Sequence, residues 1–341
     1  MAEIRFLDFD GRRVAYERSG SGPALVASAW WVSHLELDRR EARFSRFWDA
    51  LTEGFTFVRY DQPGVGLSDR VVRPGDLTLA GGVALLEALL DHLGLGTATL
   101  IGGSGGGPAA IALAARQPER VERLVLYGTF ADGSAITTRE VQEAVVGSVR
   151  AHWGLGSRML ADIFLGDAES AAQEQFARLQ REAATAETAA ALLERVYRLD
   201  VRGELERVRA PALVVHRRED RAIPYRAGRE LATALPDATF VPLTGSAHLP
   251  WFDDADSVVR ALRGVLAPQR PVAPEEPAAL FSRREREVLA LVAEGLSDKQ
   301  IAERLVLSRH TVHRHVANIR RKLGRGSRAA AVAEAARLGL I

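Results

Sequence analysis

The chain has 341 residues, 47% hydrophobic and 26% charged, a composition typical of a globular protein with room for about two domains. It contains no cysteine, which excludes disulfides, thiolate catalysis and cysteine-based metal sites. Charge is uneven: residues 281–341 hold 13 Lys or Arg and 6 Asp or Glu, whereas the first 280 residues hold 32 and 38. We therefore expect only the basic tail to meet a polyanion.

The first residues do not read as a signal peptide, because Met1–Arg5 is charged and Asp8 and Asp10 follow closely. The longest apolar run, Ala24–Val32, is too short to span a bilayer. The sequence thus predicts a cytoplasmic protein with no membrane partner, and no motif in it indicates a metal or a cofactor.

Eight β-rich runs alternate with helical patterns along the first 267 residues. A hairpin turning at Asp10-Gly11 opens the series. Strands are predicted at 4–8, 13–17, 23–27, 55–60, 98–101, 121–127, 212–216 and 239–243. Apolar residues recur at the spacing of a helix in 44–51, 77–95 and 108–116. This alternation predicts an α/β fold with a doubly wound, mostly parallel sheet covered on both faces.

One segment, about 134–200, breaks the alternation, because it holds several helical patterns and no strand-like run. It follows a strand of the sheet, so it is expected to sit over the carboxyl ends of the strands, where such sheets bind ligands. We interpret it as a helical lid, with a plain packing layer of helices as the alternative.

Between the predicted strand 98–101 and the helix 108–116 lies Gly102-Gly103-Ser104-Gly105-Gly106. The pattern G-x-S-x-G between strand and helix is typical of a sharp turn that exposes a serine at the head of the helix. Side chains at Gly102 and Gly106 would collide with neighbouring backbone. The helix N-terminus favours negative charge that develops near the serine. An ordinary glycine-rich turn is the alternative.

Ser104, Asp220 and His248 follow one another in the chain order of the α/β-hydrolase fold, which residues 5–267 resemble. The resemblance also rests on Asp61–Ser68 and on the loop Asp220–Pro224. It implies a nucleophile, a base and an acid: His248 would activate the Ser104 hydroxyl, and Asp220 would orient the imidazole. Glu219 is the neighbouring alternative for the acid.

The family usually has His-Gly after the strand that corresponds to 25–27, whereas this chain has Ser28-Ala29-Trp30-Trp31. An oxyanion hole would then combine the Gly105 N–H with a backbone N–H of Ala29 or Trp30. Trp30 and Trp31 are predicted to line the ligand pocket as flat apolar walls, with core packing as the alternative. His34 is predicted at the pocket entrance.

Prolines at 268, 271, 274 and 277 mark 268–280 as a linker with polyproline II character. The tail 281–341 reads as four helices. Ser282, Ser297, Ser308 and Ser327 are their N-terminal caps, and Gly295 ends the first. Two short helices joined by a tight turn, the second rich in Arg and His, predict a helix-turn-helix.

Three motifs of the tail closely resemble the LuxR-type DNA-binding domain. They are Arg-Glu-x-Glu-Val-Leu at 284–289, Gly-Leu-Ser at 295–297 and Thr-Val-x-x-His-Val at 311–316. The resemblance implies double-stranded DNA as partner, with His313 and Arg314 facing the major groove and the fourth helix forming a homodimer. Implied phosphate contacts come from Arg309, Thr311, Asn318 and Lys322.

Together these patterns predict a ligand-responsive transcriptional regulator that binds, and in one interpretation slowly hydrolyses, a small apolar ester, lactone or acyl compound. The alternative is an active serine esterase or lactonase with an appended regulatory DNA-binding domain. A third interpretation is a hydrolase fold that serves only as a dimerisation scaffold and takes no ligand.

Overall fold

The computed structural model of the chain describes residues 3–266, 281, 283–305, 307–323, 325 and 327–337. It divides into two compact units, Met1–Val265 and Leu266–Ile341, which are described separately below. The linker predicted at 268–280 lies outside the described residues. No helix in the described parts is long and apolar enough to cross a membrane.

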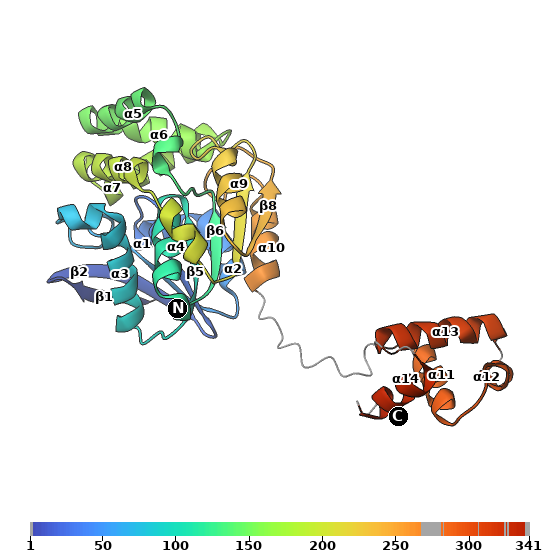
Figure 1. Cartoon of the computed structure of the whole chain (residues 1–341). Helices are drawn as coiled ribbons and strands as arrows, with labels where there is room; N and C mark the ends of the chain where they lie inside the picture. Colours follow the sequence, from blue (N-terminus) through green and yellow to red (C-terminus); the bar gives the residue numbers. More distant parts are fainter. Residues whose placement is uncertain are drawn as a thin grey trace. The chain divides into compact units, whose positions relative to one another are not determined.

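In the described part of the first unit, eight strands form one sheet in the order β1-β2-β4-β3-β5-β6-β7-β8 (Figure 1). The strands are β1 (Glu3–Phe9), β2 (Arg12–Gly20), β3 (Ala24–Ala27), β4 (Thr56–Tyr60), β5 (Ala98–Gly103), β6 (Val121–Tyr127), β7 (Ala212–Arg217) and β8 (Ala238–Leu243). The hairpin β1–β2 and the pair β2–β4 are antiparallel, and the other neighbours are parallel. Asp10 and Gly11 turn the hairpin with φ of 52° and 72°. The predicted mostly parallel sheet is confirmed.

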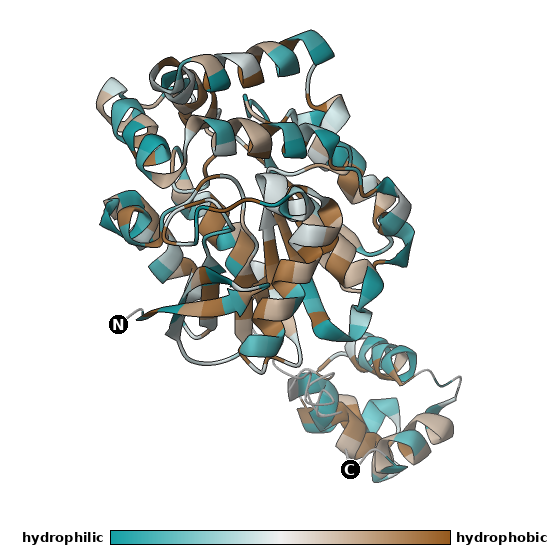
Figure 2. Cartoon of the chain, turned by 90° about the vertical axis from the view of Figure 1, so that its left-hand side faces the viewer, coloured by the Kyte–Doolittle hydropathy of each residue, from teal (hydrophilic) through white to brown (hydrophobic). Residues whose placement is uncertain are grey.

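Helices cover both faces of this sheet. They are α1 (Leu35–Arg40), α2 (Ala42–Thr52), α3 (Leu79–His92), α4 (Gly107–Arg116), α9 (Tyr225–Ala234) and α10 (Ala255–Leu266), with short 3₁₀ turns η1 (Pro74–Leu77), η2 (Ser104–Gly106), η3 (Pro118–Arg120) and η5 (Arg202–Arg207). Leu89 of α3, Ile111 of α4 and Leu231 of α9 belong to one core with Leu100 of the sheet. On the other side, Trp48 of α2 stacks on Phe57 of β4, with ring centroids 4.7 Å apart. Figure 2 shows the apolar strands enclosed between helices whose outer faces are polar.

The segment between β6 and β7 is helical. It holds η4 (Gly133–Ala135), α5 (Arg139–Ala151), α6 (Trp153–Leu165), α7 (Ser170–Ala183) and α8 (Ala186–Arg198), called here the inserted helices. An isolated bridge between Asp132 and Asp200 ties the two ends of the segment together. Val149, Leu160 and Leu193 of these helices share a core with Trp31 and Leu249, which lie outside the inserted helices. The inserted helices are therefore packed onto the loops at one end of the sheet (Figure 1).

The second unit is all-α in its described residues, as predicted. Its helices are α11 (Arg283–Ala293), α12 (Asp298–Leu305), α13 (Arg309–Lys322) and α14 (Arg328–Arg337). Ser308 caps α13 by accepting the Thr311 N–H at 3.1 Å. Ile301, Val316 and Ala335 belong to a core that all four helices share. The Ser282 cap lies outside the described residues.

Candidate functional sites

The glycine-flanked serine occupies a strained turn between β5 and α4. Ser104 has φ of 48°, a left-handed conformation that non-glycine residues rarely adopt. A Cβ at Gly102 would stand 2.8 Å from the Gly107 Cα, and one at Gly106 would stand 2.5 Å from the Ser28 Oγ. The chain thus has no room for side chains on either side of the serine, which is the physical reason for the spacing found in the sequence.

Asp220 and His248 form a buried pair. Nδ1 of His248 lies 2.8 Å from Oδ2 of Asp220, and the two residues are 2% and 8% exposed. The other oxygen, Oδ1, accepts the N–H groups of Ala222 and Ile223 at 2.9 and 3.1 Å. Burial alone would raise the pKa of Asp220, but the His248 charge and hydrogen bond, with these amides, hold it below its usual value. An ionised Asp220 fixes the proton of His248 on Nδ1 and leaves Nε2 as the basic atom.

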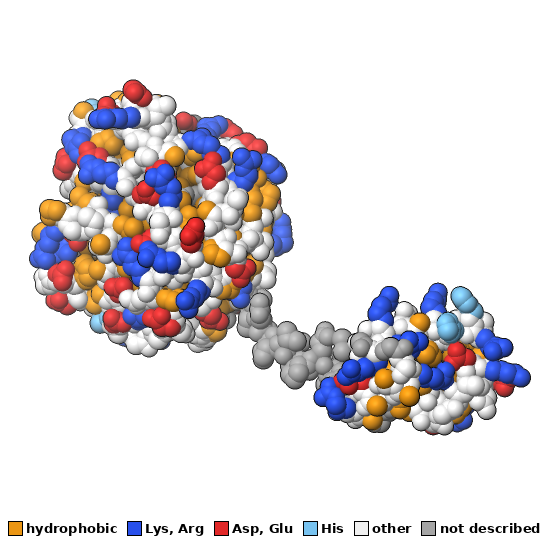
Figure 3. Space-filling model, in the orientation of Figure 1, with side chains coloured by type: hydrophobic (Ala, Val, Ile, Leu, Met, Phe, Trp, Pro, Cys, Tyr) orange, Lys and Arg blue, Asp and Glu red, His pale blue; other side chains and the backbone are white. Residues whose placement is uncertain are grey.

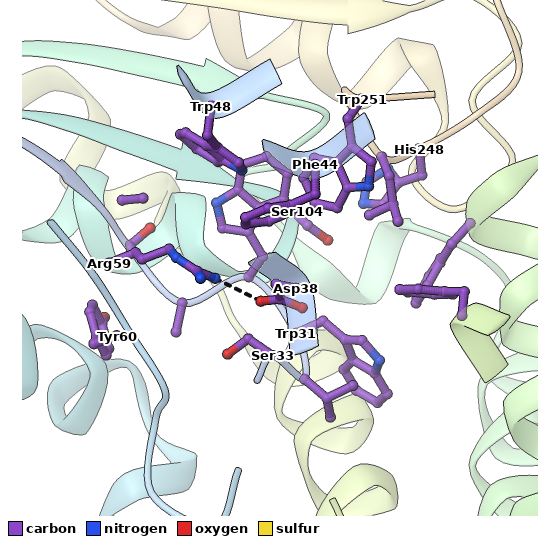
Figure 4. Close-up of a pocket in the computed structure, with 18 residues that line it drawn as sticks. Trp31, Ser33, Asp38, Phe44, Trp48, Arg59, Tyr60, Ser104, His248 and Trp251 are labelled. Atoms are coloured by element: carbon purple, nitrogen blue, oxygen red, sulfur yellow. Dashed lines mark hydrogen bonds and ion pairs between the residues drawn. The ribbon is translucent and has the colours of Figure 1, made fainter. Parts of the chain in front are cut away.

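The basic nitrogen of His248 faces the serine's cavity without a partner. Nε2 is buried, and no group in the described residues forms a hydrogen bond with it. His248 and Ser104 line the same cavity (Figure 4), and Asp220 is joined to it through its contact with His248. Ser104 and His248 do not form a hydrogen bond with each other in this structure, and catalytic contacts of this kind often tighten only when substrate binds.

The cavity at this site is small and aromatic. It measures about 90 Å³. Its aromatic walls are Trp30, Trp31, Phe44, Trp48, Tyr60, Phe164, Phe176 and Trp251. Both predicted tryptophans therefore line it, and Trp30 also stacks on Trp251 with ring centroids 6.1 Å apart. Two of the residues predicted to form the oxyanion hole are neighbours, because the Trp30 carbonyl oxygen is 2.8 Å from where a Cβ would stand on Gly105.

His34 does not line this cavity, contrary to its predicted place at the entrance. Its Nδ1 accepts the Leu37 N–H at 3.4 Å and caps α1. The residue therefore acts on the backbone of a short helix, while its neighbours Val32 and Ser33 line the cavity.

Sequence reasoning missed two charged residues in the cavity wall. Asp38 of α1 and Arg59 of β4 line it and pair at 2.8 Å, as the dashed line in Figure 4 shows. Arg59 also binds Glu17 of β2 at 2.7 Å. Burial raises the pKa of Asp38 to about 6, which Arg59 opposes and Asp61 reinforces. The signal in the sequence was an arginine inside a strand, 56–60, whose residues are otherwise apolar or uncharged.

His216, at the end of β7, is a second group that the sequence analysis did not single out. Its Nε2 donates to the Ile223 carbonyl at 2.9 Å and lies 3.6 Å from the Asp220 carboxylate. Burial lowers the pKa of His216, so this ring stays neutral and supports the Asp220 loop. Among the described residues, no group of three or more His, Asp or Glu side chains is arranged to hold a metal ion.

In the second unit, α13 carries the residues predicted to contact DNA. Arg309, His313 and Arg314 are exposed, and Figure 3 shows basic and histidine side chains gathered over this helix. Thr311 lies in the first turn, where its hydroxyl is 2.8 Å from that of Ser308. The exposed cations of α13 form the positive surface that a phosphate backbone requires.

Three more of the residues predicted to contact DNA have partners inside the unit. Nζ of Lys322 lies 2.6 Å from Oε2 of Glu285, a residue only 5% exposed. The Asn318 side-chain oxygen accepts a hydrogen bond from Arg321 at 3.1 Å. His313 lies 3.6 Å from the Asp298 carboxylate. Lys322 thus has a structural partner that the helical spacing of the sequence did not indicate.

A doubly wound sheet, a serine on a strained strand-to-helix turn and a buried Asp–His pair beside it define the first unit as an α/β-hydrolase fold. Residues 42–153 match the family described as alpha/beta hydrolase fold, and residues 279–335 match the bacterial regulatory proteins of the luxR family. The chain belongs to the α/β-hydrolase family and carries a LuxR-family DNA-binding domain after it.

The relatives of the first unit are hydrolases. The chain is 30% identical over 247 residues to a 2-hydroxy-6-oxononadienedioate/2-hydroxy-6-oxononatrienedioate hydrolase of Paraburkholderia phymatum, covering 70% of this chain and 81% of that one. A solved hydrolase from Pseudomonas aeruginosa is 27% identical with a TM-score of 0.67, covering 77% of this chain and 98% of that one. The enol-lactonase from Burkholderia xenovorans is 26% identical with a TM-score of 0.63, covering 77% and 100%.

Proposed function

We propose that this protein is a ligand-responsive transcriptional regulator. Its hydrolase-fold unit binds and slowly hydrolyses a small apolar ester, lactone or acyl compound, and the bound compound changes how the LuxR-type domain binds DNA. The observation that carries this proposal is the shared cavity of Ser104 and His248. Phe164 of α6 and Phe176 of α7 also line it, so an occupant touches both the reactive groups and the inserted helices.

The proposed chemistry is acyl transfer to Ser104. The hydroxyl oxygen attacks the ester or lactone carbonyl while Nε2 of His248 takes its proton, and Asp220 stabilises the resulting imidazolium. The N–H of Gly105 and one from Ala29 or Trp30 would bind the oxyanion. His248 then protonates the leaving alcohol, and water, deprotonated by the same nitrogen, releases the acid from Ser104. The substrate and one water yield one acid and one alcohol.

Trp31 supports the idea that the inserted helices sense the occupant. Its ring lines the cavity, and its Nε1 donates to Gln180 of α7 at 3.4 Å. Its carbonyl accepts from Gln62 at 2.8 Å, and Gln62 in turn accepts from Arg195 of α8 at 2.8 Å. A ligand that displaces Trp31 would therefore shift contacts to two of the inserted helices, which act as the lid in this proposal.

The test uses the full-length chain and a fluorescent duplex that this chain selects from random-sequence DNA. Affinity is measured by anisotropy with and without a panel of short-chain p-nitrophenyl esters and γ-lactones. We expect at least one compound to change the affinity by about fivefold or more, in the range of typical allosteric coupling. The Ser104→Ala variant keeps this response to a binding compound. Equal affinity under every condition, for compounds that bind by calorimetry, would refute the regulatory proposal.

The second candidate is a working esterase or lactonase whose DNA-binding domain regulates or localises it. The buried Nε2 of His248 favours it, because this nitrogen has no partner among the described residues and its ring lines the cavity that Ser104 also lines. Release of p-nitrophenol separates the two candidates. Rapid turnover that is lost in Ser104→Ala, together with DNA binding that ignores the substrate, would favour the enzyme.

From the LuxR-type domain we also propose that the chain forms a homodimer. We propose a cytoplasmic location for the same reason, because the DNA that it would bind lies there. The sequence places Ala331, Ala335, Leu338 and Ile341 on one face of the fourth helix as a candidate dimer seam. Ala331 and Ala335 are buried within the unit, and Leu338 and Ile341 lie outside the described residues. Light scattering of the full-length chain tests the homodimer, for which we expect twice the mass of 37.1 kDa.

A further inference from the structure

A second buried space lies next to the reactive cavity and contains an arginine. Arg195 of α8 is only 7% exposed and lines a cavity of about 20 Å³. Ser28, Ala29 and Tyr60 line both cavities, so this loop and this strand residue separate one from the other. The rest of the wall includes the first turn of α3, at Gly81 and Gly82.

The guanidinium of Arg195 is poorly satisfied. Nη1 donates to Oε1 of Gln62 at 2.8 Å, but Nε is buried and has no partner among the described residues. No carboxylate oxygen of the described residues lies within 4.0 Å of this side chain. Nη2 stands 2.6 Å from where a Cβ would lie at Gly82, so the absence of a side chain there makes room for the guanidinium.

The buried charges around this cavity do not balance. Asp76 also lines the cavity, but Arg12, itself 4% exposed, binds both of its oxygens. Asp76 is therefore already paired, and Asp10 and Asp69 also act on Arg12, whereas the charge of Arg195 has no carboxylate partner of its own among the described residues. Burial lowers the pKa of Arg195, an effect that Tyr60 and Asp76 oppose. A buried charge without a counterion is costly, so this excess calls for an anion.

We propose that this cavity binds one chloride ion. Its volume suits a single water-sized species and is too small for sulfate, phosphate or a carboxylate ligand. The free Nε and Nη2 edge of Arg195 would hold the ion, and the N-terminal turn of the 14-residue helix α3 adds a favourable dipole. Tyr60 lines the same cavity. A water molecule would fill the same volume but would leave the charge uncompensated.

A chloride here would join α8 of the inserted helices to α3 and β4 of the sheet unit. It would therefore tighten the docking of the inserted helices. Because Tyr60 lines the reactive cavity as well, the ion would also fix one wall of that cavity. This proposal does not depend on any activity of Ser104.

Thermal unfolding of the full-length chain tests the proposal, in sodium chloride against sodium gluconate at constant ionic strength. We expect the Tm to rise by about 3 to 5 °C for each tenfold increase in chloride above its dissociation constant. Arg195→Met should abolish this chloride response. Arg198→Met is the matched control: it lies on the same helix with a side chain 75% exposed, and should keep the response.

Crystals of the wild-type chain grown in sodium bromide give a readout that needs no variant. An anomalous peak between Arg195 and the first turn of α3 would support the site. Water density without an anomalous peak, or a Tm that depends on ionic strength alone, would overturn it.

Discussion

Replacing Asp38 by Asn should change how the stability of the first unit depends on pH. In the folded chain the pKa of Asp38 rises from 3.8 to about 6, mainly because the carboxyl is buried. Between these two values the folded state holds a proton that the unfolded state has lost, so stability falls as pH rises. A difference of about two pKa units corresponds to about 3 kcal/mol, lost between about pH 4 and pH 6. Asn does not titrate and removes this contribution.

The substitution should leave the fold intact, because Arg59 keeps its bond to Glu17 at 2.7 Å and its bond to the Leu35 carbonyl at 2.6 Å. The free energy of unfolding of both chains is measured by urea titration from pH 4.5 to pH 7.5. The variant should gain about 1.4 kcal/mol relative to the wild type for each pH unit up to about pH 5.5, and then level off.

Asp49→Asn is the matched control, since Asp49 pairs with Arg39 but its side chain is 69% exposed. Its stability profile should run parallel to that of the wild type. A constant difference between Asp38→Asn and the wild type across this range would refute the reasoning. It would mean that the Asp38 carboxyl is solvated and that the cavity wall is open to water.

Other substitutions test the two sites. Ser104→Ala should lower kcat/KM for p-nitrophenyl acetate by about a thousandfold or more without changing the Tm by more than a few degrees, as followed by p-nitrophenol release and calorimetry. Trp30→Ala should enlarge the reactive cavity, cost about 3 to 5 kcal/mol in urea unfolding, and let longer acyl esters bind. Arg314→Ala should reduce the slope of log affinity for DNA against log salt by about 1. Lys322→Ala should reduce that slope less and lower the thermal stability of the second unit, because it removes the ion pair between Lys322 and the buried Glu285.

The sequence by itself determined the features that depend on neighbours along the chain. The strained turn at Ser104 needs glycines two residues away on each side, and only a local pattern can supply them. The capping serine of α13 and the apolar spacing of its core positions are equally local. The mostly parallel sheet and the four-helix tail could therefore be predicted from short-range periodicity and turn chemistry.

Only the tertiary structure decided which distant side chains share a buried space. Asp38 and Arg59 come from different elements and meet because the packing of α1 against β4 buries both in the cavity wall. His34 caps α1 and is not among the residues that line the cavity. Arg195 is one arginine of an amphipathic helix, and nothing in its neighbours along the chain marks it as buried. Contacts between distant residues follow from how whole elements pack, which periodicity along the chain does not encode.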